Sequence, residues 1–306
     1  MNKKIDIIAK IDNSNQGNHF CNITVLDVNK KAINIKLEKE ELSDLVIGKA
    51  YVFNCDVVEK EEKEIFQLIK ATLIEDYLDD KKLAKILPKF YDYAPIKFQE
   101  LKKEIEKYLN SIDNKVIKEI TIGLYKQYKN EFFTHPAATK FHHAYVGGLA
   151  FHTLTMLRLT KTFLEVYPYL NKDLLYAGII LHDMAKISEI TNVDGEYTKE
   201  GLLLGHLVMI AIEVEKMGVK LGYEKTEEAL MLKHIVVSHH GLLNFGSPKR
   251  PQTGEALLIW FLDTIDSKFS PLGTAYDEIK DGEFTNILQV LDRIKFYKTT
   301  INKEIK

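Results

Sequence analysis

Histidine and carboxylate residues gather in one part of this sequence, within stretches that are otherwise apolar. Nine of the ten histidines lie between residues 135 and 240. Four residues interrupt the apolar stretches GGLAFHTLTMLRL, LLYAGIILHD and ALLIWFLDTI: His152, His182, Asp183 and Asp263. A carboxylate inside an apolar helix is costly unless it is paired or bound to a cation. These positions therefore indicate a buried site that holds positive charge.

A divalent metal ion would satisfy this set of residues. Neutral imidazole nitrogen and carboxylate oxygen bind Zn, Mn, Fe or Co, and the absence of cysteine ligands argues against a structural zinc site. Three helices could bring the four residues to one ion, and His206, His239 and His240 could add a second ion. Adjacent helix residues point about 100° apart, so the last two need not contribute equally. A hydrogen-bonded core histidine is the alternative for His206 taken alone, and it is retained for His135 and His234.

The composition is that of a globular protein with more than one domain. The chain has 306 residues, 45% of them hydrophobic, and a net charge of −2 from 42 basic and 44 acidic side chains. At about 150 residues per domain, this length predicts two domains. The charge balance gives no global field for nucleic acid, so a polyanion would need a local basic patch. Cys21 and Cys55 are too few for a disulfide scaffold and are expected to be buried, reduced thiols.

The sequence predicts neither a secretion signal nor a membrane span. The first residues, MNKKIDIIAKIDN, lack the apolar core of a signal peptide. The longest apolar runs, such as ALLIWFL, are far shorter than the roughly 20 residues that cross a bilayer. We therefore expect a cytoplasmic protein without membrane contact, and the sequence leaves assembly into a homo-oligomer open.

Residues 1–75 alternate between apolar and polar side chains with a period of two. The alternation is clear in CNITVLD, AINIKL and YVFNCDV, and polar turns such as NSNQGN separate the runs. It predicts about five short strands with a helical piece near 40–45, which favours an OB-fold barrel that could bind nucleic acid. Aromatic side chains on such a barrel could stack on bases: Phe20, Tyr51, Phe53 and Phe66. For Tyr51 and Phe53, burial in the barrel core is the favoured alternative.

The period changes to that of amphipathic helices from about residue 80 onward. Residues 76–130 are predicted to form a helical connector, and 131–306 to form a helical domain with C-terminal helices. Helical patterns in this second part recur over the following ranges: 144–166, 173–186, 201–218, 226–240, 254–268 and 284–297. The pair Asp194-Gly195 predicts a short β-ribbon. The expected fold is therefore α+β: an N-terminal β-barrel, then an all-α bundle with a β-ribbon insertion.

The pattern H…HD…D resembles the HD-domain metal-dependent phosphohydrolases. Longer segments bring the resemblance closer to the YhaM family of 3′→5′ exoribonucleases: FFTHPAATKFHHAYVGGLAFHT, LHDMAKISEI, GHLVMIAIEV, and SHHGLLNFGSPKRPQTGEA followed by DTIDSK. The likeness is dense over about 130–270 and thinner over 80–130, and in the barrel it rests more on pattern than on motif. It implies an N-terminal OB-fold, a helical HD domain and hydrolysis of phosphodiester bonds in RNA.

The resemblance also implies roles for individual residues. The ligands of one metal ion would be His152, His182, Asp183 and Asp263. Asp183 would bridge to a second ion held by three histidines: His206, His239 and His240. Lys186 matches the lysine of the family's HDxxK pattern and would face the scissile phosphate, while Ala185 and Leu262 depart from the family's usual residues without removing a ligand. The implied cofactor is one or two divalent ions, with Mn first and Co, Fe, Mg or Zn as alternatives.

Two further groups of residues could contact the substrate. His143 or His142 could contact it or donate a proton, and a buried structural role is an equal alternative. The loop GLLNFGSPKRPQTGE follows the second histidine pair, and Gly241 can end the preceding helix. Lys249 and Arg250 on this loop could grip the RNA backbone, or the loop could be an ordinary solvated one.

Three functions are compatible with these residues. The favoured one is a metal-dependent 3′→5′ exoribonuclease that releases nucleoside 5′-monophosphates from single-stranded RNA, with single-stranded DNA as an open alternative substrate. The second is an HD-type phosphohydrolase of cyclic dinucleotides or small nucleotides. The third is a non-catalytic nucleic-acid-binding protein. The predicted barrel and the GSPKR loop favour a polymeric substrate, and the presence of every expected ligand argues against the third function.

Overall fold

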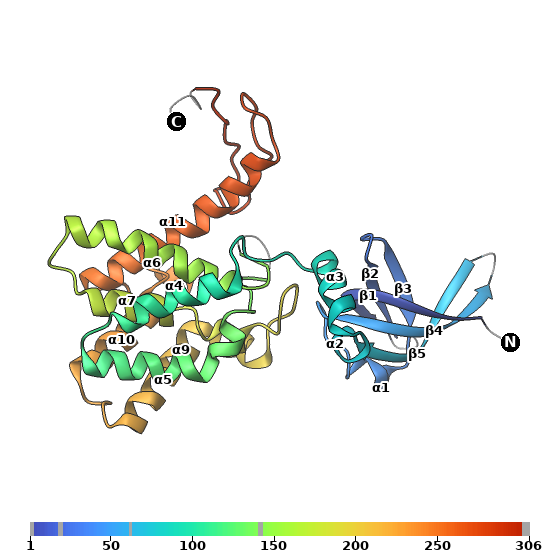
Figure 1. Ribbon diagram of the computed structural model, residues 1–306, viewed down its shortest axis with the longest axis horizontal. Coiled ribbons are helices and arrows are strands. Elements are labelled where there is room, and N and C mark those ends of the chain that lie inside the picture. Colours follow the sequence, from blue (N-terminus) through green and yellow to red (C-terminus); the bar gives the residue numbers. More distant parts are fainter. Residues whose placement is uncertain (1–2, 18–20, 61–62, 140–142, 302–306) are drawn as a thin grey trace.

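The computed structural model describes residues 3–17, 21–60, 63–139 and 143–301, and it shows a β-barrel beside a helical domain (Figure 1). In these residues five strands close into the barrel. Their bounds are β1 (Lys3–Gln16), β2 (Cys21–Asp27), β3 (Ala32–Lys36), β4 (Ala50–Lys60) and β5 (Lys63–Leu73). Their order is β1-β2-β3-β5-β4, with β3 and β5 parallel and the other neighbours antiparallel. The predicted OB-like barrel is confirmed.

The alternating pattern of the strands places one face of each in the barrel core. On β1 the buried side chains lie two residues apart: Ile7, Ala9 and Ile11. Tyr51 and Phe53 of β4 are 4% and 0% exposed, so they are core residues and the favoured alternative to a stacking role is confirmed. Phe66 packs, partly buried, against the same core, and Phe20 lies outside the described residues.

Short helices flank the barrel and lead toward the helical domain. α1 (Lys39–Leu42) lies between β3 and β4, where a helical piece near 40–45 was predicted. α2 (Ile74–Tyr77) and α3 (Asp80–Phe90) follow β5 directly. Phe90 is buried in a small apolar cluster that includes Ala50 of β4, so α3 packs on the barrel.

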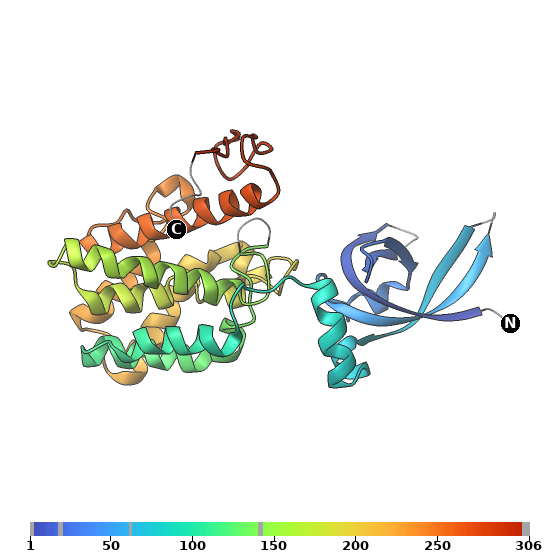
Figure 2. The same ribbon diagram turned by 45° about the horizontal axis from the view of Figure 1, so that its top comes forward.

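The remaining helices form one bundle around a shared apolar core. Their bounds are α4 (Phe98–Asn110), α5 (Lys115–Phe132), α6 (Gly148–Val166), α7 (Lys172–Leu181), α8 (Lys186–Glu189), α9 (Lys199–Leu221), α10 (Glu227–Ser238) and α11 (Gly254–Asp277), with a 3₁₀ turn, η1 (Leu243–Phe245). α6, α7 and α11 lie side by side (Figure 2). α4 and α5 belong to this core, because Leu101, Ile105 and Ile120 are buried in the same cluster as the later helices.

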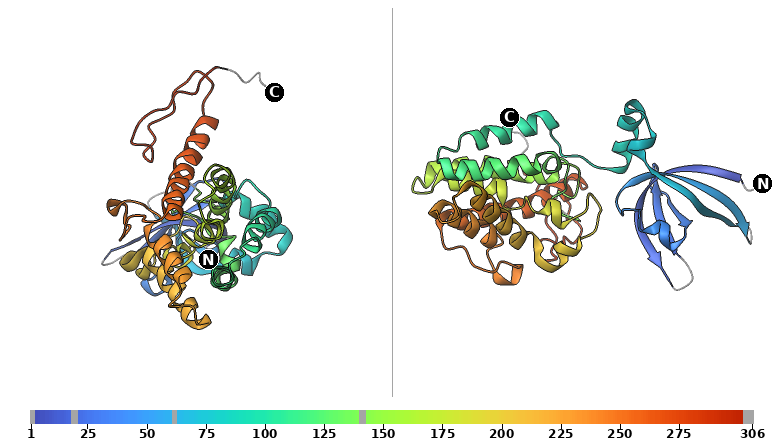
Figure 3. Two further views of the ribbon diagram at one scale, coloured as in Figure 1. Left: turned by 90° about the vertical axis from the view of Figure 1, so that its left-hand side faces the viewer. Right: turned by 90° about the horizontal axis from the view of Figure 1, so that it is seen from below.

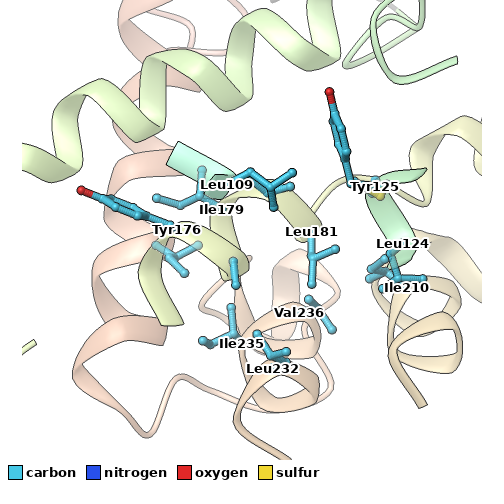
Figure 4. Packing of buried hydrophobic residues seen from close by; sticks show 14 of the residues in the cluster. Leu109, Leu124, Tyr125, Tyr176, Ile179, Leu181, Ile210, Leu232, Ile235 and Val236 are labelled. Atoms are coloured by element: carbon cyan, nitrogen blue, oxygen red, sulfur yellow. The ribbon is translucent and has the colours of Figure 1, made fainter. Parts of the chain in front are cut away.

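The central helix of this bundle is α7, which is apolar on every side because neighbours surround it. Leu181 of α7 is directed toward Val236 of α10 (Figure 4). A Cβ atom at Gly178 would lie 2.6 Å from Ile259 and 2.8 Å from Ile235, so glycine allows α10 and α11 to approach α7 closely. This close packing brings the ends of the three helices together.

A tight turn of the helical domain, residues 190–197, contacts the barrel and is called the docking turn below. A single antiparallel bridge joins its first and last residues, so the predicted β-ribbon is reduced to one bridge. At its tip Asp194 has a φ of 55° and accepts a hydrogen bond of 2.6 Å from Lys10 of β1. Val193 is buried, and its carbonyl oxygen would lie 2.3 Å from a Cβ at Gly48. The barrel loop can therefore approach the turn only with glycine at this position.

The predicted helix over 284–297 is wrong. α11 ends at Asp277, and in residues 278–301 the structure describes turns and isolated bridges without a helix. Asp292 and Arg293 have φ values of 54° and 59°, which turn the chain back on itself. Most helical stability comes from burying an apolar face, yet Phe284 is 62% exposed. Figure 3 shows this segment and the end of α11 projecting from the bundle.

A helix needs a long apolar stretch to cross a bilayer, and none of the described helices is both long and apolar enough to do so.

Candidate metal centre

The helical bundle brings all the predicted metal ligands to one buried place. They come from α6 (His152), the turn after α7 (His182 and Asp183), α9 (His206), the end of α10 (His239 and His240) and α11 (Asp263). In one cluster, the ligand atoms of Asp183, His206, His239 and His240 lie within 4.8 Å of one another. In another, those of Asp183, His152 and His182 do so. The two clusters share Asp183.

The end of α7 sets the position of His182 and Asp183. The Asn171 side chain begins the helix by accepting two main-chain N–H groups, and the helix ends at Leu181. His182 keeps helical dihedral angles, and its Nδ1 lies 2.8 Å from the carbonyl oxygen of Ile179. The apolar helix thus delivers an imidazole and a carboxylate to the middle of the core.

Asp183 stands between two groups of imidazole nitrogens. Its Oδ2 lies 3.3 Å from Nε2 of His182 and 3.7 Å from Nε2 of His152. Its Oδ1 lies 3.3 Å from Nε2 of His206 and 3.5 Å from Nε2 of His239. Each carboxylate oxygen therefore faces one histidine group, which is the arrangement of a carboxylate that could bridge two ions.

Two other ligands complete these groups. Oδ1 of Asp263 lies 3.4 Å from Nε2 of His152, one of the two rings that face Oδ2 of Asp183. The ring of His240 lies 4.6 Å from that of His239 and 5.0 Å from that of His206, measured between centroids. One group therefore offers two imidazoles and two carboxylates, and the other offers three imidazoles and the Asp183 carboxylate.

The Nδ1 atoms of four ligand histidines already have partners. The Nδ1 contacts are His182 with Ile179 O at 2.8 Å, His239 with Val236 O at 2.8 Å, His152 with Asp266 at 2.6 Å and His206 with Glu189 at 2.9 Å. Carbonyl and carboxylate oxygens only accept hydrogen bonds, so the proton belongs on Nδ1. A neutral ring then directs the lone pair of Nε2 into the centre, as a metal ligand requires.

Buried polar atoms without partners test whether the site fits a metal ion. Among the described residues, Oδ1 of Asp183 and Nε2 of His206 and His239 are buried and make no hydrogen bond. Such atoms are costly unless something satisfies them. Imidazole and carboxylate ligands without sulfur suit Mn, Fe, Co or Zn. The residues present therefore fit divalent ions.

The charges of Asp183, Lys186 and His239 agree with this ligand role, whereas Asp263 and Asp266 raise the pKa of His152 to about 10 despite burial, so a metal ion would replace a proton on that ring. Burial would raise the pKa of Asp183, but the Lys186 ammonium and the His182 ring outweigh it and hold the pKa well below the usual value. Nζ of Lys186 lies 2.8 Å from Oδ2 of Asp183, and the carboxylate raises the lysine's pKa despite burial. Burial lowers the pKa of His239 to about 3, so this ring is neutral at physiological pH. Asp183 is thus an ionised ligand beside a charged lysine.

Two buried carboxylates, Glu189 and Asp266, lie behind the ligand histidines and were not singled out from the sequence. Oδ2 of Asp266 lies 2.6 Å from Nδ1 of His152 and 2.7 Å from Nε2 of His143. At these distances Asp266 forms direct hydrogen bonds with the two rings. Ligand atoms that bind one ion at about 2.1 Å would lie farther apart from one another than this, so the spacing fits hydrogen bonds and not a shared ion. Asp266 follows Asp263 by three residues on one helix face, and this spacing was the available signal.

His143 is placed behind His152, away from the Nε2 atoms that face Asp183. It is 2% exposed, its Nε2 contacts Asp266, and its Nδ1 lies 2.6 Å from the Tyr145 hydroxyl. Burial lowers the pKa of His143, which favours the neutral ring. His142, the other residue considered for this role, lies outside the described residues.

The remaining histidines and the basic loop lie around the centre. His135 is buried, and burial lowers its pKa to about 4. Nε2 of His234 accepts a hydrogen bond of 3.0 Å from the main-chain N–H of Gln252, which ties α10 to the loop before α11. Lys249 and Arg250 are exposed on that loop. The loop is therefore anchored while its basic side chains are open to solvent.

Comparison with known proteins places the candidate ligands within a recognised domain. The HD domain profile matches residues 149–268, which include every predicted metal ligand. The chain is 42% identical over 210 residues to a protein of Geobacillus sp. named 3′-5′ exoribonuclease YhaM, covering 68% of this chain and 64% of that protein. Proteins of the same name from Bacillus subtilis and Bacillus licheniformis are each 41% identical over 215 residues, covering 70% of this chain and 68% of theirs.

The matches therefore span about two thirds of the length of these relatives. They are similar to this chain over most of its own length. The chain belongs to the YhaM family.

Proposed function

We propose that this chain is a metal-dependent 3′→5′ exoribonuclease that hydrolyses single-stranded RNA and releases nucleoside 5′-monophosphates. The observation that carries this proposal is Asp183, whose two oxygens face two groups of imidazole nitrogens. A shared carboxylate of this kind suits phosphodiester hydrolysis with two metal ions. The step to RNA rests on the relatives' name and on the barrel that precedes the helical domain.

The residues that would hold the ions follow from the two clusters, with Asp263 added to the first through its contact of 3.4 Å with His152. One ion would be held by His152, His182, Asp183 and Asp263, and the other by Asp183, His206, His239 and His240. The chemistry that such ions supply is Lewis acidity, which polarises phosphoryl oxygens and lowers the pKa of water to about 7. We propose Mn as the native ion, because its preference for oxygen ligands fits the carboxylates of a ligand set without sulfur.

The partly open edge of the centre indicates where the substrate phosphate approaches. The side chains of Asp263 and Lys186 are 19% and 14% exposed, whereas those of His152 and His182 are at most 1% exposed. Lys186 therefore lies where a phosphate group would enter, and its ammonium would stabilise negative charge that develops during hydrolysis.

Replacing Lys186 by Met should lower kcat by about 10²- to 10³-fold, the usual cost of removing one charge-stabilising donor. Lys186→Arg keeps the positive charge and should recover part of the rate. The measurement is single-turnover cleavage of a labelled RNA, with metal content determined on the same preparations. An unchanged rate in the Met variant would contradict the role, and a loss of bound metal would instead assign Lys186 to the support of Asp183.

The basic loop before α11 is proposed to hold the RNA backbone. Lys249→Ala combined with Arg250→Ala should weaken RNA binding. The slope of log affinity against log salt concentration should become shallower by about 1.4, because each of the two lost phosphate contacts contributes about 0.7. Lys220 and Lys225 are a matched exposed pair near the end of α9, about 20 Å along the helix from His206. Their double Ala variant should bind RNA as the parent does, and equal slopes for both variants would refute the loop's role.

One assay separates the three functions. A 5′-labelled single-stranded RNA is incubated with the protein and Mn²⁺, with and without chelator, beside a single-stranded DNA of the same sequence. A ladder that shortens from the 3′ end supports the proposal, and the DNA lane defines the second substrate. An intact oligomer together with turnover of small nucleotides supports the phosphohydrolase alternative. Binding without cleavage of any substrate supports the non-catalytic alternative.

Cellular location and assembly are also proposals. Cys21 and Cys55 are buried free thiols, which suits the reducing cytoplasm. We propose that the protein degrades RNA there. Exposed apolar side chains on and beyond the outer half of α11, such as Phe269 and Phe284, support self-association. Light scattering of the purified chain would determine the number of subunits.

A further inference from the structure

We infer that Glu189 is a positioning residue that holds His206 in place as a ligand of the second metal ion. This inference rests on the proposed second ion. Oε1 of Glu189 lies 2.9 Å from the main-chain nitrogen of His206 and 3.0 Å from its Nδ1, and Oε2 lies 2.9 Å from the same Nδ1. One carboxylate therefore holds both the backbone and the ring of His206.

Both partners are buried, so this contact is not an incidental surface pair. Glu189 is 7% exposed and His206 is 6% exposed. Nε2 of His206, on the opposite side of the ring, lies 3.3 Å from Oδ1 of Asp183 and makes no hydrogen bond. With Nδ1 held by Glu189, the ring can turn very little, and Nε2 stays directed toward Asp183.

The backbone around His206 is built to allow this contact. Gly205 has φ 71° and ψ 154°, a region that only glycine adopts readily, and it divides α9 into two segments. The second segment begins at His206, so its first N–H group needs an acceptor from outside the helix. The Glu189 carboxylate supplies that acceptor.

The position of Glu189 is itself fixed by close packing. A Cβ atom at Gly201 would lie 2.4 Å from the carbonyl oxygen of Glu189, so the start of α9 rests directly on the end of α8. The main-chain N–H of Thr198 also donates to that carbonyl at 2.8 Å. Glu189 is thereby held by its backbone while its side chain holds His206.

Asp266 offers a matched comparison at the other ligand group. It contacts Nδ1 of His152 as Glu189 contacts Nδ1 of His206. Removing a carboxylate that orients a metal-binding histidine typically costs 10- to 100-fold in metal affinity. Each carboxylate contacts a histidine of a different group, so each substitution should weaken the binding of a different ion.

The test is a calorimetric titration of the metal-free full-length protein with Mn²⁺, without RNA. We expect two ions to bind the parent. Glu189→Ala should weaken one of them by about 10- to 100-fold and leave the other unchanged. Glu189→Gln keeps an oxygen acceptor for His206 and should lose less affinity than the Ala variant. Asp266→Asn should weaken the binding of the ion that Glu189→Ala leaves unchanged. The double variant should bind both ions more weakly, which would show that the two substitutions act on different sites.

The melting temperature of each metal-free variant shows whether it is folded. If Glu189→Ala does not fold, the Gln variant decides, and it must still weaken one ion selectively. Unchanged affinity for both ions, an equal loss at both, or a parent that binds a single ion would each overturn the inference. Because no RNA is present, a protein that binds two ions as expected but fails to cleave RNA would refute the proposed function and leave the role of Glu189 standing.

Discussion

Changing Asp183 to Ala should abolish RNA hydrolysis, with a loss of at least about 10³-fold in rate. Among the described residues, Asp183 is the one that the two clusters share, so both ions would lose a ligand together. Metal ions supply several kcal/mol of transition-state stabilisation, and each 1.36 kcal/mol corresponds to about tenfold in rate. The measurement is single-turnover cleavage together with bound-metal content by mass spectrometry.

Two further variants make this result specific. Asp183→Asn keeps the shape of the side chain without its charge, and it should lose nearly as much activity. Asp113→Ala removes an acidic residue whose side chain is 84% exposed and should leave rate and metal content unchanged. Asp183 variants that are folded and retain both metal content and activity would show that the centre is not the catalytic one.

Removing divalent ions should stop turnover completely and also lower the melting temperature. The centre buries an ionised carboxylate and polar atoms that make no hydrogen bond, so bound ions should stabilise the folded protein. Ligand at 100 times its dissociation constant adds about 2.7 kcal/mol per site. Thermal melting of dialysed protein, before and after addition of Mn, Co, Fe, Mg or Zn, measures the effect and ranks the ions.

The Asp183→Ala variant provides the control for chelation. Added Mn²⁺ should raise the melting temperature of the parent and leave that of the variant nearly unchanged. Activity that persists after exhaustive dialysis against chelator would rule out a metal-dependent reaction. An equal shift in both proteins would place the stabilising ion somewhere else in the chain.

The metal centre was predictable because each ligand is a polar residue in an apolar setting. His152, His182 and Asp263 interrupt stretches that otherwise read as buried helices, and the structure shows them buried or nearly so. The barrel was predictable for a similar reason, since a strand with one buried face must alternate. In both cases a local pattern reflects which side of the element meets the core.

The residues that support the ligands could not be derived in this way. Glu189 sits in the short segment AKISE, where a charged side chain looks like an ordinary exposed one. Glu189 is buried because α9 packs against α8, and a local sequence pattern carries no information about that contact. Asp266 carried a weak signal in its spacing from Asp263, but that spacing is also common on solvated helices.

The helix predicted over 284–297 is wrong because a clear local pattern has no partner element in the fold. Its apolar spacing fits a helix, but periodicity cannot show whether another element is present to cover the apolar face. Phe284 and Ile294 are 62% and 50% exposed, so no described neighbour buries them. A pattern predicts an element reliably only where the fold supplies its partner.

The docking turn gives the barrel a direct mechanical connection to the second ligand group. The turn begins immediately after Glu189, and the chain that leaves it becomes the segment of α9 before His206. Through Lys10 and Asp194, the barrel therefore holds the short stretch that separates a ligand from its support. Thermodynamic linkage is reciprocal. If ion binding changes the affinity of the barrel for this turn by some factor, then contact with the barrel must change the affinity for the ions by the same factor.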